Sequence, residues 1–406
     1  MWVKAMKTAT LSVPTSSPIP ATSWAPCLAT CLLLAGTVPH PTRAAETWMF
    51  ATPEALPAPI NLPNSFQATP WLSADGLTLY FSSDRPGGQG GIDLWVAERN
   101  SIDDPWNAPI NLGPPINTAR ADLGPSLSAD GLTLYFMDGN PFGVAPRAGG
   151  PGNYQIWTAK RATKQSPWEN PEDLQSPVGS RGIESYPHLA SDGLALYFTS
   201  DRSTPDGLFV STRLTEESPW GTPTNLGPAI NQGSWSGFPH LSSSGLHLFF
   251  ETDRPGGRGG FDLWMSTRSA VQDAWPTPVN LGAQINGSFF DVSPCVSADF
   301  PALGSYLLFA RNDTDSWTTR FKIYRAEVIP NLTVLRASSL DQDGAWTPTT
   351  ATFTKVSANS IQSEVTIAAA NEAFYRVSMA GGGGTVHIES SERVGNKLRL
   401  RYTWAQ

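Results

Sequence analysis

The carboxylates of this chain could catalyse glycoside hydrolysis, because that reaction needs only two suitably placed acids. Three acids fall outside the repeating pattern of the sequence and could supply such a pair: Glu184, Glu251 and Asp291. Nothing else in their surroundings recommends them, so we assign no catalytic residue. The Gly-x-Ser-x-Gly motif of serine hydrolases is missing from the sequence, which excludes that class of esterase and peptidase.

Two histidines, His188 and His240, each follow a proline at the same point of a repeated segment. Such a pair could converge and bind a metal ion. In the other copies of the segment, however, the same position holds Trp71, Ser126 and Cys295. We therefore interpret the histidines as packing residues, and we predict no metal site and no cofactor.

Cysteine chemistry is limited to one residue. Cys27 and Cys31 lie in an N-terminal segment that we expect to be removed, which leaves only Cys295. A single cysteine allows neither an intramolecular disulfide nor a cysteine-rich metal site. We expect Cys295 to be a buried free thiol.

An Asp-Arg pair recurs at 84–85, 201–202 and 253–254, while the second copy of the pattern keeps only Asp138. These pairs could form a ring of charges that grips an ionic ligand. Alternatively, there could be one ion pair or backbone cap per blade, which would lock each blade to its neighbour. Repetition favours the structural role, because a single site rarely needs the same residue from every repeat.

Two glycine-rich segments, 87–93 and 256–262, faintly resemble calcium-binding glycine-aspartate repeats. Those repeats occur in tandem at a nine-residue spacing, so that neighbouring turns share an ion. The two segments here are isolated and one residue too long, which favours an ordinary connection.

The elements that must position these residues repeat along the chain. A motif close to Pro-x-Leu-Ser-Ala-Asp-Gly occurs four times, and a fifth time in degenerate form. Its Asp position recurs at residues 75, 130, 192, 244 (a serine) and 299, in steps of 55, 62, 52 and 55. This period, with several short strands in each unit, is typical of a β-propeller.

The first unit predicts four antiparallel strands, the number in one propeller blade. The expected strands are 70–73, 77–82, 92–96 and 108–112. Asp75 and Gly76 predict a tight hairpin turn with positive φ at both residues. Aromatic residues recur 11 positions apart, as at Trp95 and Trp106, and we interpret them as packing between blades.

Ring closure can also be predicted. Segment 57–62 copies the fourth-strand motif at 108–112, and the fifth unit has no obvious fourth strand after Arg325. We expect the N-terminal segment to complete the last blade, which would leave the ring without a free edge. This predicts five four-stranded blades, or six if the tail from Asn331 joins the ring.

The expected architecture is therefore all-β, with a propeller over 46–334 and a small C-terminal β module over 335–406. The second unit carries a Gly- and Pro-rich insertion, 139–153, which is the loop best placed to touch a ligand. Residues 1–45 have the pattern of a secretory signal peptide, with an apolar stretch over 24–38. We expect no membrane span after its cleavage.

Composition limits the partners. Charged residues make up 15% of the chain and the net charge is −8, so the protein has no basic surface for nucleic acid. The low charge, together with 36 Gly, 36 Pro and 15 Trp, argues against disorder and long helices. We expect a monomer.

The units resemble the WD-like β-propeller repeats of bacterial TolB-type proteins and of some OmpA-family envelope proteins. The residues that carry the resemblance are Leu-Ser-Ala-Asp-Gly-Leu-Thr-Leu-Tyr-Phe-Ser-Ser-Asp-Arg-Pro-Gly-Gly over 72–88 and Gly-Ile-Asp-Leu-Trp-Val over 91–96. The similarity covers roughly 57–328. It implies a secreted or periplasmic propeller whose blades serve as a platform for binding a protein or another ligand.

We therefore expect an exported, non-enzymatic binding or scaffolding protein of the bacterial cell envelope or extracellular space. Its partner would be a protein or a glycan docked on one propeller face. The alternative is a carbohydrate-active enzyme of propeller fold with a central carboxylate pair. Two carboxylates about 5–10 Å apart in a deep central pocket would favour the enzyme, and a flat or plugged face would favour binding.

Overall fold

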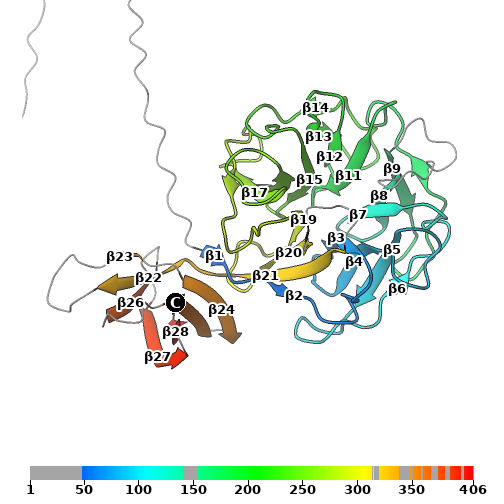
Figure 1. The fold of residues 1–406 in the computed structure, drawn as a ribbon. Helices are drawn as coiled ribbons and strands as arrows, with labels where there is room; N and C mark the ends of the chain where they lie inside the picture. Colours follow the sequence, from blue (N-terminus) through cyan, green and yellow to red (C-terminus); the bar gives the residue numbers. More distant parts are fainter. Residues whose placement is uncertain are drawn as a thin grey trace, which may run out of the picture. The chain divides into compact units, whose positions relative to one another are not determined.

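The structure, a computed structural model, is built from β-strands, with no helix among the residues it describes. These are residues 48–139, 154–312, 314, 320–337, 347–348, 351–357, 360–366, 374–379, 385–394 and 397–405. Five four-stranded antiparallel sheets succeed one another around a ring (Figure 1). This confirms the predicted five-bladed β-propeller, and the tail from Asn331 adds no sixth blade.

Each of the first four blades is formed by four consecutive strands, listed here from the innermost strand outwards. Blade 1 contains β3 (Gln67–Leu72), β4 (Thr78–Ser83), β5 (Asp93–Glu98) and β6 (Ile110–Asn111). Blade 2 contains β7 (Asp122–Leu127), β8 (Thr133–Gly139), β9 (Tyr154–Lys160) and β10 (Glu172–Asp173). Blade 3 contains β11 (Glu184–Leu189), β12 (Ala195–Ser200), β13 (Gly207–Thr212) and β14 (Thr224–Asn225). Blade 4 contains β15 (Ser236–Leu241), β16 (His247–Thr252), β17 (Asp262–Thr267) and β18 (Val279–Asn280).

The fifth blade joins the two ends of the propeller. It contains β19 (Asp291–Val296), β20 (Tyr306–Arg311) and β21 (Lys322–Pro330), and its outer strand is the N-terminal β2 (Glu54–Ala55). In the register of β2 against β21, Glu54 lies opposite Arg325 and Ala55 opposite Tyr324. A further N-terminal strand, β1 (Trp48–Phe50), pairs with the other end of β21. The N-terminal segment therefore closes the ring, as predicted.

The prediction was wrong about which residues form the closing strand. Segment 57–62 does not pair as a strand; it forms the connection into blade 1, where Ile60 is fully buried. Asn61 Nδ2 donates to Ile323 O at 2.8 Å, and Asn61 Oδ1 accepts from Ile323 N at 2.9 Å. Asn117 contacts Leu94 in the same way between blades 1 and 2. The error arose because the first unit contains the Ile-Asn pair twice, six residues apart, at 110–111 in the outer strand and at 116–117 in the connection.

Replacing Asn61 by alanine should weaken ring closure. Its side chain makes the two hydrogen bonds to Ile323 and a third to Leu56 O at 2.7 Å. At about 1 kcal/mol for each bond, we expect Asn61→Ala to lower the free energy of unfolding by roughly 2–3 kcal/mol. Urea denaturation measures this loss. The exposed Asn107 is the control, and an equal effect of Asn107→Ala would contradict this account of closure.

The hairpin turns differ from the prediction in one detail. Gly76 has φ +70°, and the equivalent Gly131, Gly193 and Gly245 are also in the left-handed region. Asp75 is not; instead its Oδ1 accepts a hydrogen bond from Leu77 N at 2.9 Å. The aspartate is therefore favoured as a turn cap rather than for a positive φ.

The predicted packing of paired aromatics at blade borders is confirmed. Trp95 and Trp106 belong to an apolar cluster that also contains Cys295 and Tyr306 of blade 5. Arg99 stacks over Trp106 at 4.3 Å from the ring centroid and donates to the Tyr306 hydroxyl at 3.0 Å. The same stack recurs in the next three blades as Arg161–Trp168, Arg213–Trp220 and Arg268–Trp275. These arginines join neighbouring blades, so their repetition reflects the architecture.

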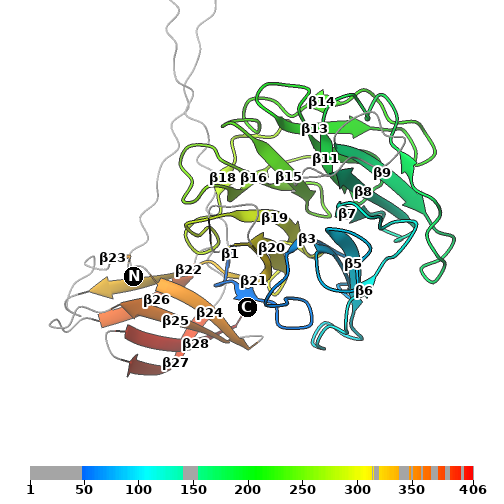
Figure 2. The ribbon, with the colours of Figure 1, turned by 45° about the vertical axis from the view of Figure 1, so that its right-hand side comes forward.

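The C-terminal residues form two small antiparallel sheets (Figure 2). One contains β22 (Leu332–Ala337), β23 (Thr347–Pro348) and β26 (Phe374–Met379). The other contains β24 (Ala351–Ser357), β25 (Ser360–Thr366), β27 (Thr385–Val394) and β28 (Lys397–Ala405). A small β module was predicted here from alternating runs, although its boundary near residue 335 stays a prediction.

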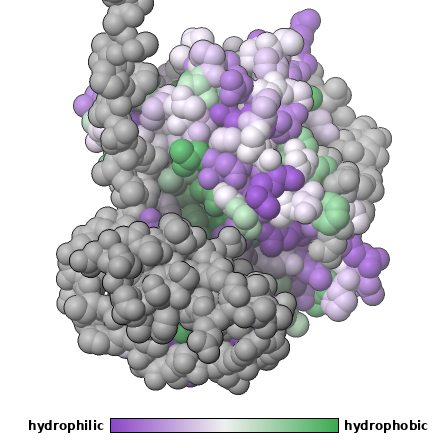
Figure 3. Space-filling view, turned by 60° about the vertical axis from the view of Figure 1, so that its left-hand side comes forward, coloured by the Kyte–Doolittle hydropathy of each residue, from purple (hydrophilic) through white to green (hydrophobic). Residues whose placement is uncertain are grey.

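Two sequence-based predictions lie outside the described residues. These are the signal peptide over 1–45 and all but the first residue of the insertion over 139–153. Within the part of the chain that the structure describes, no helix is long and apolar enough to cross a membrane. On the face of the propeller shown in Figure 3, hydrophilic and intermediate residues predominate and hydrophobic residues form separate spots.

Candidate functional site

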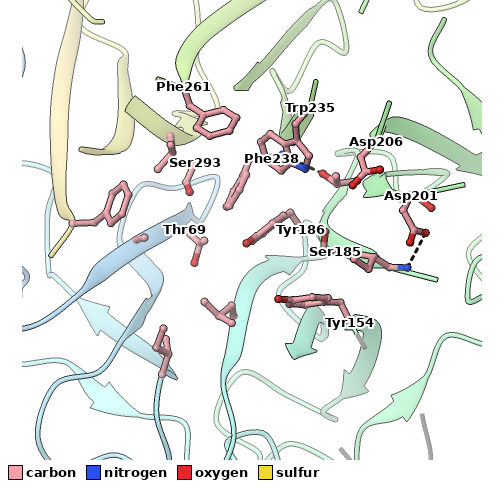
Figure 4. A pocket seen from close by; sticks show the side chains of 18 of the residues that line it. Thr69, Tyr154, Ser185, Tyr186, Asp201, Asp206, Trp235, Phe238, Phe261 and Ser293 are labelled. Atoms are coloured by element: carbon pink, nitrogen blue, oxygen red, sulfur yellow. Dashed lines mark hydrogen bonds between the residues drawn. The ribbon is translucent and has the colours of Figure 1, made fainter. Parts of the chain in front are cut away.

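A pocket of about 470 Å³ opens at the centre of the ring (Figure 4). Every blade contributes lining residues, for example Phe66 from blade 1, Tyr154 from blade 2, Tyr186 from blade 3, Phe238 from blade 4 and Phe321 from blade 5. Its size lies within the range of ligand pockets, which is roughly 300–1,000 Å³. Propellers commonly surround a central channel, and this pocket occupies the mouth of that channel.

The upper wall of the pocket comes from one repeated position at the start of the third strand of each blade, where the residue lies directly before the strand or, in blade 2, is its first residue. The five residues at this position are Ile92, Tyr154, Asp206, Phe261 and Phe321. The five blades therefore place very different side chains at the same level of the ring. This variation gives the pocket a different chemical character on each side.

The floor comes from a bulge in the innermost strand of each blade. A residue with positive φ lies at each bulge, and a proline follows it: Thr69, Gly124, Tyr186, Phe238 and Ser293. Four of the five are not glycine, and such backbone strain costs on the order of 1–3 kcal/mol per residue. The bulges turn these residues toward the channel, where the Tyr186 and Phe238 rings stack with centroids 3.4 Å apart.

Polar side chains of the neighbouring blade support three of the bulges. Ser82 Oγ accepts from Gly124 N at 3.3 Å, and Thr199 Oγ1 accepts from Phe238 N at 3.3 Å. The third acceptor is Glu251, whose Oε2 accepts from Ser293 N at 2.8 Å. These bonds hold the strained backbone because a buried N–H group needs a partner.

Below the floor the channel narrows to a cavity of about 40 Å³, which is lined by the prolines, Trp71, His188 and His240. The two histidine rings lie 4.2 Å apart, and His188 Nε2 accepts from Leu241 N of the next blade at 3.0 Å. Burial lowers the pKa of His240 to about 3 and the pKa of His188 well below its ordinary value. The neutral form of both rings is therefore favoured, and the two histidines are buried against each other at the border of blades 3 and 4, in agreement with their interpretation as packing residues.

Cys295 occupies the equivalent position in blade 5 and is fully buried. Burial raises the pKa of its thiol to about 12, so the reactive thiolate is disfavoured. The expectation of a buried free thiol is confirmed.

Two of the three acids singled out from the sequence are structural, and the prediction that they break the repeat was wrong. Glu184 and Asp291 begin the innermost strands of their blades, where blade 2 has Asp122. Each carboxylate accepts a backbone N–H of the preceding connection, from Ser180 at 3.0 Å and Gly287 at 2.6 Å. Arg202 and Arg311 form ion pairs with them at 3.3 and 2.6 Å.

Glu251 is the acid that does interrupt the repeat. At the equivalent position the other blades have Ser82, Met137, Thr199 and Ala310. The Glu251 side chain is fully buried, and its Oε1 has no hydrogen-bond partner among the described residues. Burial raises its pKa well above the ordinary value. A protonated carboxyl group behind the pocket floor fits these observations better than a carboxylate nucleophile.

A Glu251→Gln variant tests this protonation state. Since the folded-state pKa is raised above 4.5, the wild type should lose stability as the pH rises from about 4.5 toward the folded-state pKa. We expect Glu251→Gln to match the wild type at pH 4.5 and to become relatively more stable by pH 8. Urea midpoints at the two pH values measure the difference. The exposed Glu172→Gln should show no such trend, and a pH-independent Glu251→Gln difference would contradict the assignment.

The Asp-Arg pairs have the structural role that we predicted, but each aspartate caps the connection that leads into its own blade. Asp84 Oδ1 accepts from Phe66 N at 2.6 Å, and Arg85 donates to Pro59 O at 3.0 Å. Arg85 also stacks over Phe81 at 4.7 Å. In blade 2, Asp138 pairs with Asp122. The pair at the same place in blade 1 is Ser83 and Gln67. Asp138 is therefore the equivalent of Ser83 and not of Asp84.

The glycine-rich segments turn their aspartates inward. Asp262 accepts from Gly259 N at 3.0 Å and from Asn280 Nδ2 at 2.9 Å. Asp93 accepts from Asn111 Nδ2 at 2.9 Å in the same position of blade 1. These carboxylates hold the loop onto the outer strand. Among the described residues, no group of three or more His, Cys, Asp or Glu side chains could hold a metal ion.

Two acids line the pocket, Asp201 and Asp206. From the sequence, Asp201 was assigned only to a structural Asp-Arg pair, and Asp206 was missed. Asp201 Oδ1 accepts a hydrogen bond from Ile183 N at 2.9 Å, as the equivalent Asp84 does from Phe66 N in blade 1. Asp206 occupies the upper wall, and burial together with the nearby Asp201 raises its pKa. The sequence does distinguish Asp206, because an acid replaces an apolar or aromatic residue at a repeated position. The sequence does not show, however, that this position lines a pocket.

No protein-family model matches the chain, and neither does any curated protein. Solved structures similar to it include TolB from Acinetobacter baumannii, at 16% identity over 64% of this chain, with a TM-score of 0.36. Another is the α-L-arabinofuranosidase PaAbf62A from Podospora anserina in complex with cellotriose, at 13% identity over 70% of this chain and 97% of that one, with a TM-score of 0.47. The match covers 54% of the TolB chain, about half its length. These similarities do not distinguish a binding protein from a glycosidase.

Proposed function

We propose that this protein is a non-enzymatic binding protein that holds its ligand in the central pocket. The observation that carries the proposal is the pocket itself, about 470 Å³ in volume and lined by side chains from all five blades. An apolar pocket with a few polar groups is the usual form of a ligand site. Its lining includes aromatic rings such as Tyr154, Trp235 and Phe261.

The division between repeated and varied positions supports a ligand at this place. Repeated side chains, such as those of the Arg99–Trp106 stack and the Asp84 cap, hold the ring together and have partners. The upper wall, in contrast, changes from Ile92 to Asp206 to Phe321 around the ring. A requirement of the fold would favour one residue type at all five positions, so this variation is better explained by recognition of an asymmetric ligand.

The environment of the acids supports binding over catalysis. Glu184 and Asp291 are held by backbone N–H groups and arginines, and Glu251 lies behind the floor with its pKa raised. None of the three lines the pocket. A hydrolase needs an acid and a base or nucleophile that reach the scissile bond.

A glycosidase is the second candidate, because Asp201 and Asp206 both line the pocket. The raised pKa of Asp206 is the property expected of a general acid. Both residues, however, lie on the blade 3 side of the pocket (Figure 4). Catalytic carboxylates must flank the bond that they cleave.

Export to the envelope or the extracellular space belongs to the same proposal. It is supported by the signal-peptide pattern over residues 1–45. The mature chain would then fold outside the cytoplasm with a free, buried Cys295.

The two candidates can be separated with one set of oligosaccharides that includes cellotriose and xylotriose. The full chain is incubated with each sugar while reducing ends are measured, and binding is followed in parallel by calorimetry. We expect no turnover. Release of reducing ends that disappears in Asp201→Asn or Asp206→Asn would replace the binding proposal with the glycosidase.

A further inference from the structure

The charged side chains of the described pocket lining are both acidic and come from one side of the pocket. Asp201 and Asp206 are the ionisable acids among the described lining residues, and none of those residues is Lys, Arg or His. Both carboxylates belong to blade 3 and lie beside each other at the rim (Figure 4). A ligand that entered this pocket would meet negative charge with no compensating positive group.

Aromatic rings form much of the remaining wall. Trp235 lies 5.3 Å from Phe261 at an interplanar angle of 81°, and 5.8 Å from Phe238 at 64°. Both pairs are edge-to-face contacts, so the three rings pack together as one aromatic side of the pocket. Tyr154, Trp235 and Phe261 are each only half-buried, and all three line the pocket.

The floor offers one free hydroxyl. Ser293 is 4% exposed, and its Oγ has no hydrogen-bond partner among the described residues. A buried polar atom without a partner costs free energy, and this one belongs to the lining of the pocket. Two other hydroxyls at the level of the floor are engaged: Thr69 with Ser82 Oγ at 2.6 Å, and Thr199 with Phe238 N at 3.3 Å.

We propose that the ligand of the central pocket is a small organic cation with an alkylated ammonium group. This inference rests on the proposed binding function and names the ligand class. The cation would lie against the Trp235 and Phe261 rings, because the ring faces attract positive charge. The carboxylates of Asp201 and Asp206 would balance its charge at the rim.

Other ligand classes fit the lining less well. An anion would be repelled by Asp201 and Asp206. A sugar displays many hydroxyls that need donors and acceptors, because unpaired buried polar groups are costly. Two of the floor hydroxyls already have partners within the protein, and an alkylated ammonium group needs few hydrogen bonds.

A pair of probes that differ only in charge tests the proposal on the unmodified full chain. Choline carries a trimethylammonium group, and 3,3-dimethylbutan-1-ol is its neutral carbon analogue. Cation–π and charge attraction should make choline bind at least about tenfold more tightly in a calorimetric titration. The double variant Asp201→Asn/Asp206→Asn should reduce that ratio severalfold.

Asp192→Asn is the control, since it removes one negative charge from the hairpin turn of the same blade, away from the lining residues, and it should leave the ratio unchanged. If the neutral analogue binds as well as choline, the cation inference is overturned while the binding function stands. If choline fails to bind at 10 mM (about 10⁻² M, weaker than any useful site), the inference is overturned as well. Sugar turnover in the same preparation would instead overturn the proposed function.

Discussion

Acidification from pH 6.5 to pH 3 should destabilise the propeller through the buried pair His188 and His240. The folded-state pKa of both is lowered, so the unfolded chain takes up protons at a pH where the folded chain does not. Their contribution to stability is therefore present above about pH 6.5 and lost as the pH falls toward their folded-state values. For His240, with a pKa of about 3, the loss is on the order of 4 kcal/mol at roughly 1.4 kcal/mol per pH unit.

The test compares the wild type with a His188→Gln/His240→Gln variant, in which each side chain keeps a hydrogen-bond acceptor. We expect the free energy of unfolding of the variant to fall much less than that of the wild type between pH 6.5 and pH 3, as measured by urea denaturation. Ser126→Ala is the control, because Ser126 accepts from Leu189 N at 2.9 Å at the equivalent position but does not titrate. Equal acid sensitivity of the histidine variant and the wild type would disprove the assignment.

Removal of the Trp235 ring should have the largest effect on ligand binding. Its edge and face contacts with Phe238 and Phe261 form the aromatic wall. Trp235→Ala takes away one wall of the proposed cation site, and aromatic residues contribute most to cation–π attraction when they are shielded from water. We expect the affinity for choline to fall at least about tenfold, which corresponds to about 1.4 kcal/mol.

Trp106→Ala is the matched control for this variant. Trp106 is also half-buried, but it stacks on Arg99 at a blade border far from the lining residues. Its loss should lower stability and leave choline affinity unchanged. A Trp106→Ala variant that binds choline as poorly as Trp235→Ala would show that both act through the stability of the ring.

The sequence predicted the fold well because a propeller is built by repetition. The Asp-Gly turns, the aromatic residues 11 positions apart and the recurring arginines each mark a place where blades must join. Such positions tolerate little variation, so they stand out in a single sequence. The closing strand was misplaced by one motif, because both Ile-Asn copies in a unit look alike although only one of them forms a strand.

The pocket could not be predicted in the same way. Its wall takes one residue from each blade, and Ile92, Asp206 and Phe321 share neither type nor local motif. The bulges that aim Tyr186 and Phe238 into the channel are preceded by no distinctive residue and followed only by a proline. The repeat indicates where the structure is constrained, whereas the site lies where the copies differ.

The central claim is that the pocket beside Trp235 holds the ligand. Fluorine NMR of the full chain labelled with 5-fluorotryptophan tests it directly, with the Trp235 resonance assigned from a Trp235→Phe variant. The account predicts that choline shifts the Trp235 resonance in a saturable way and leaves that of Trp106 in place. A Trp235 resonance that stays fixed while choline saturates another site on the protein would contradict it.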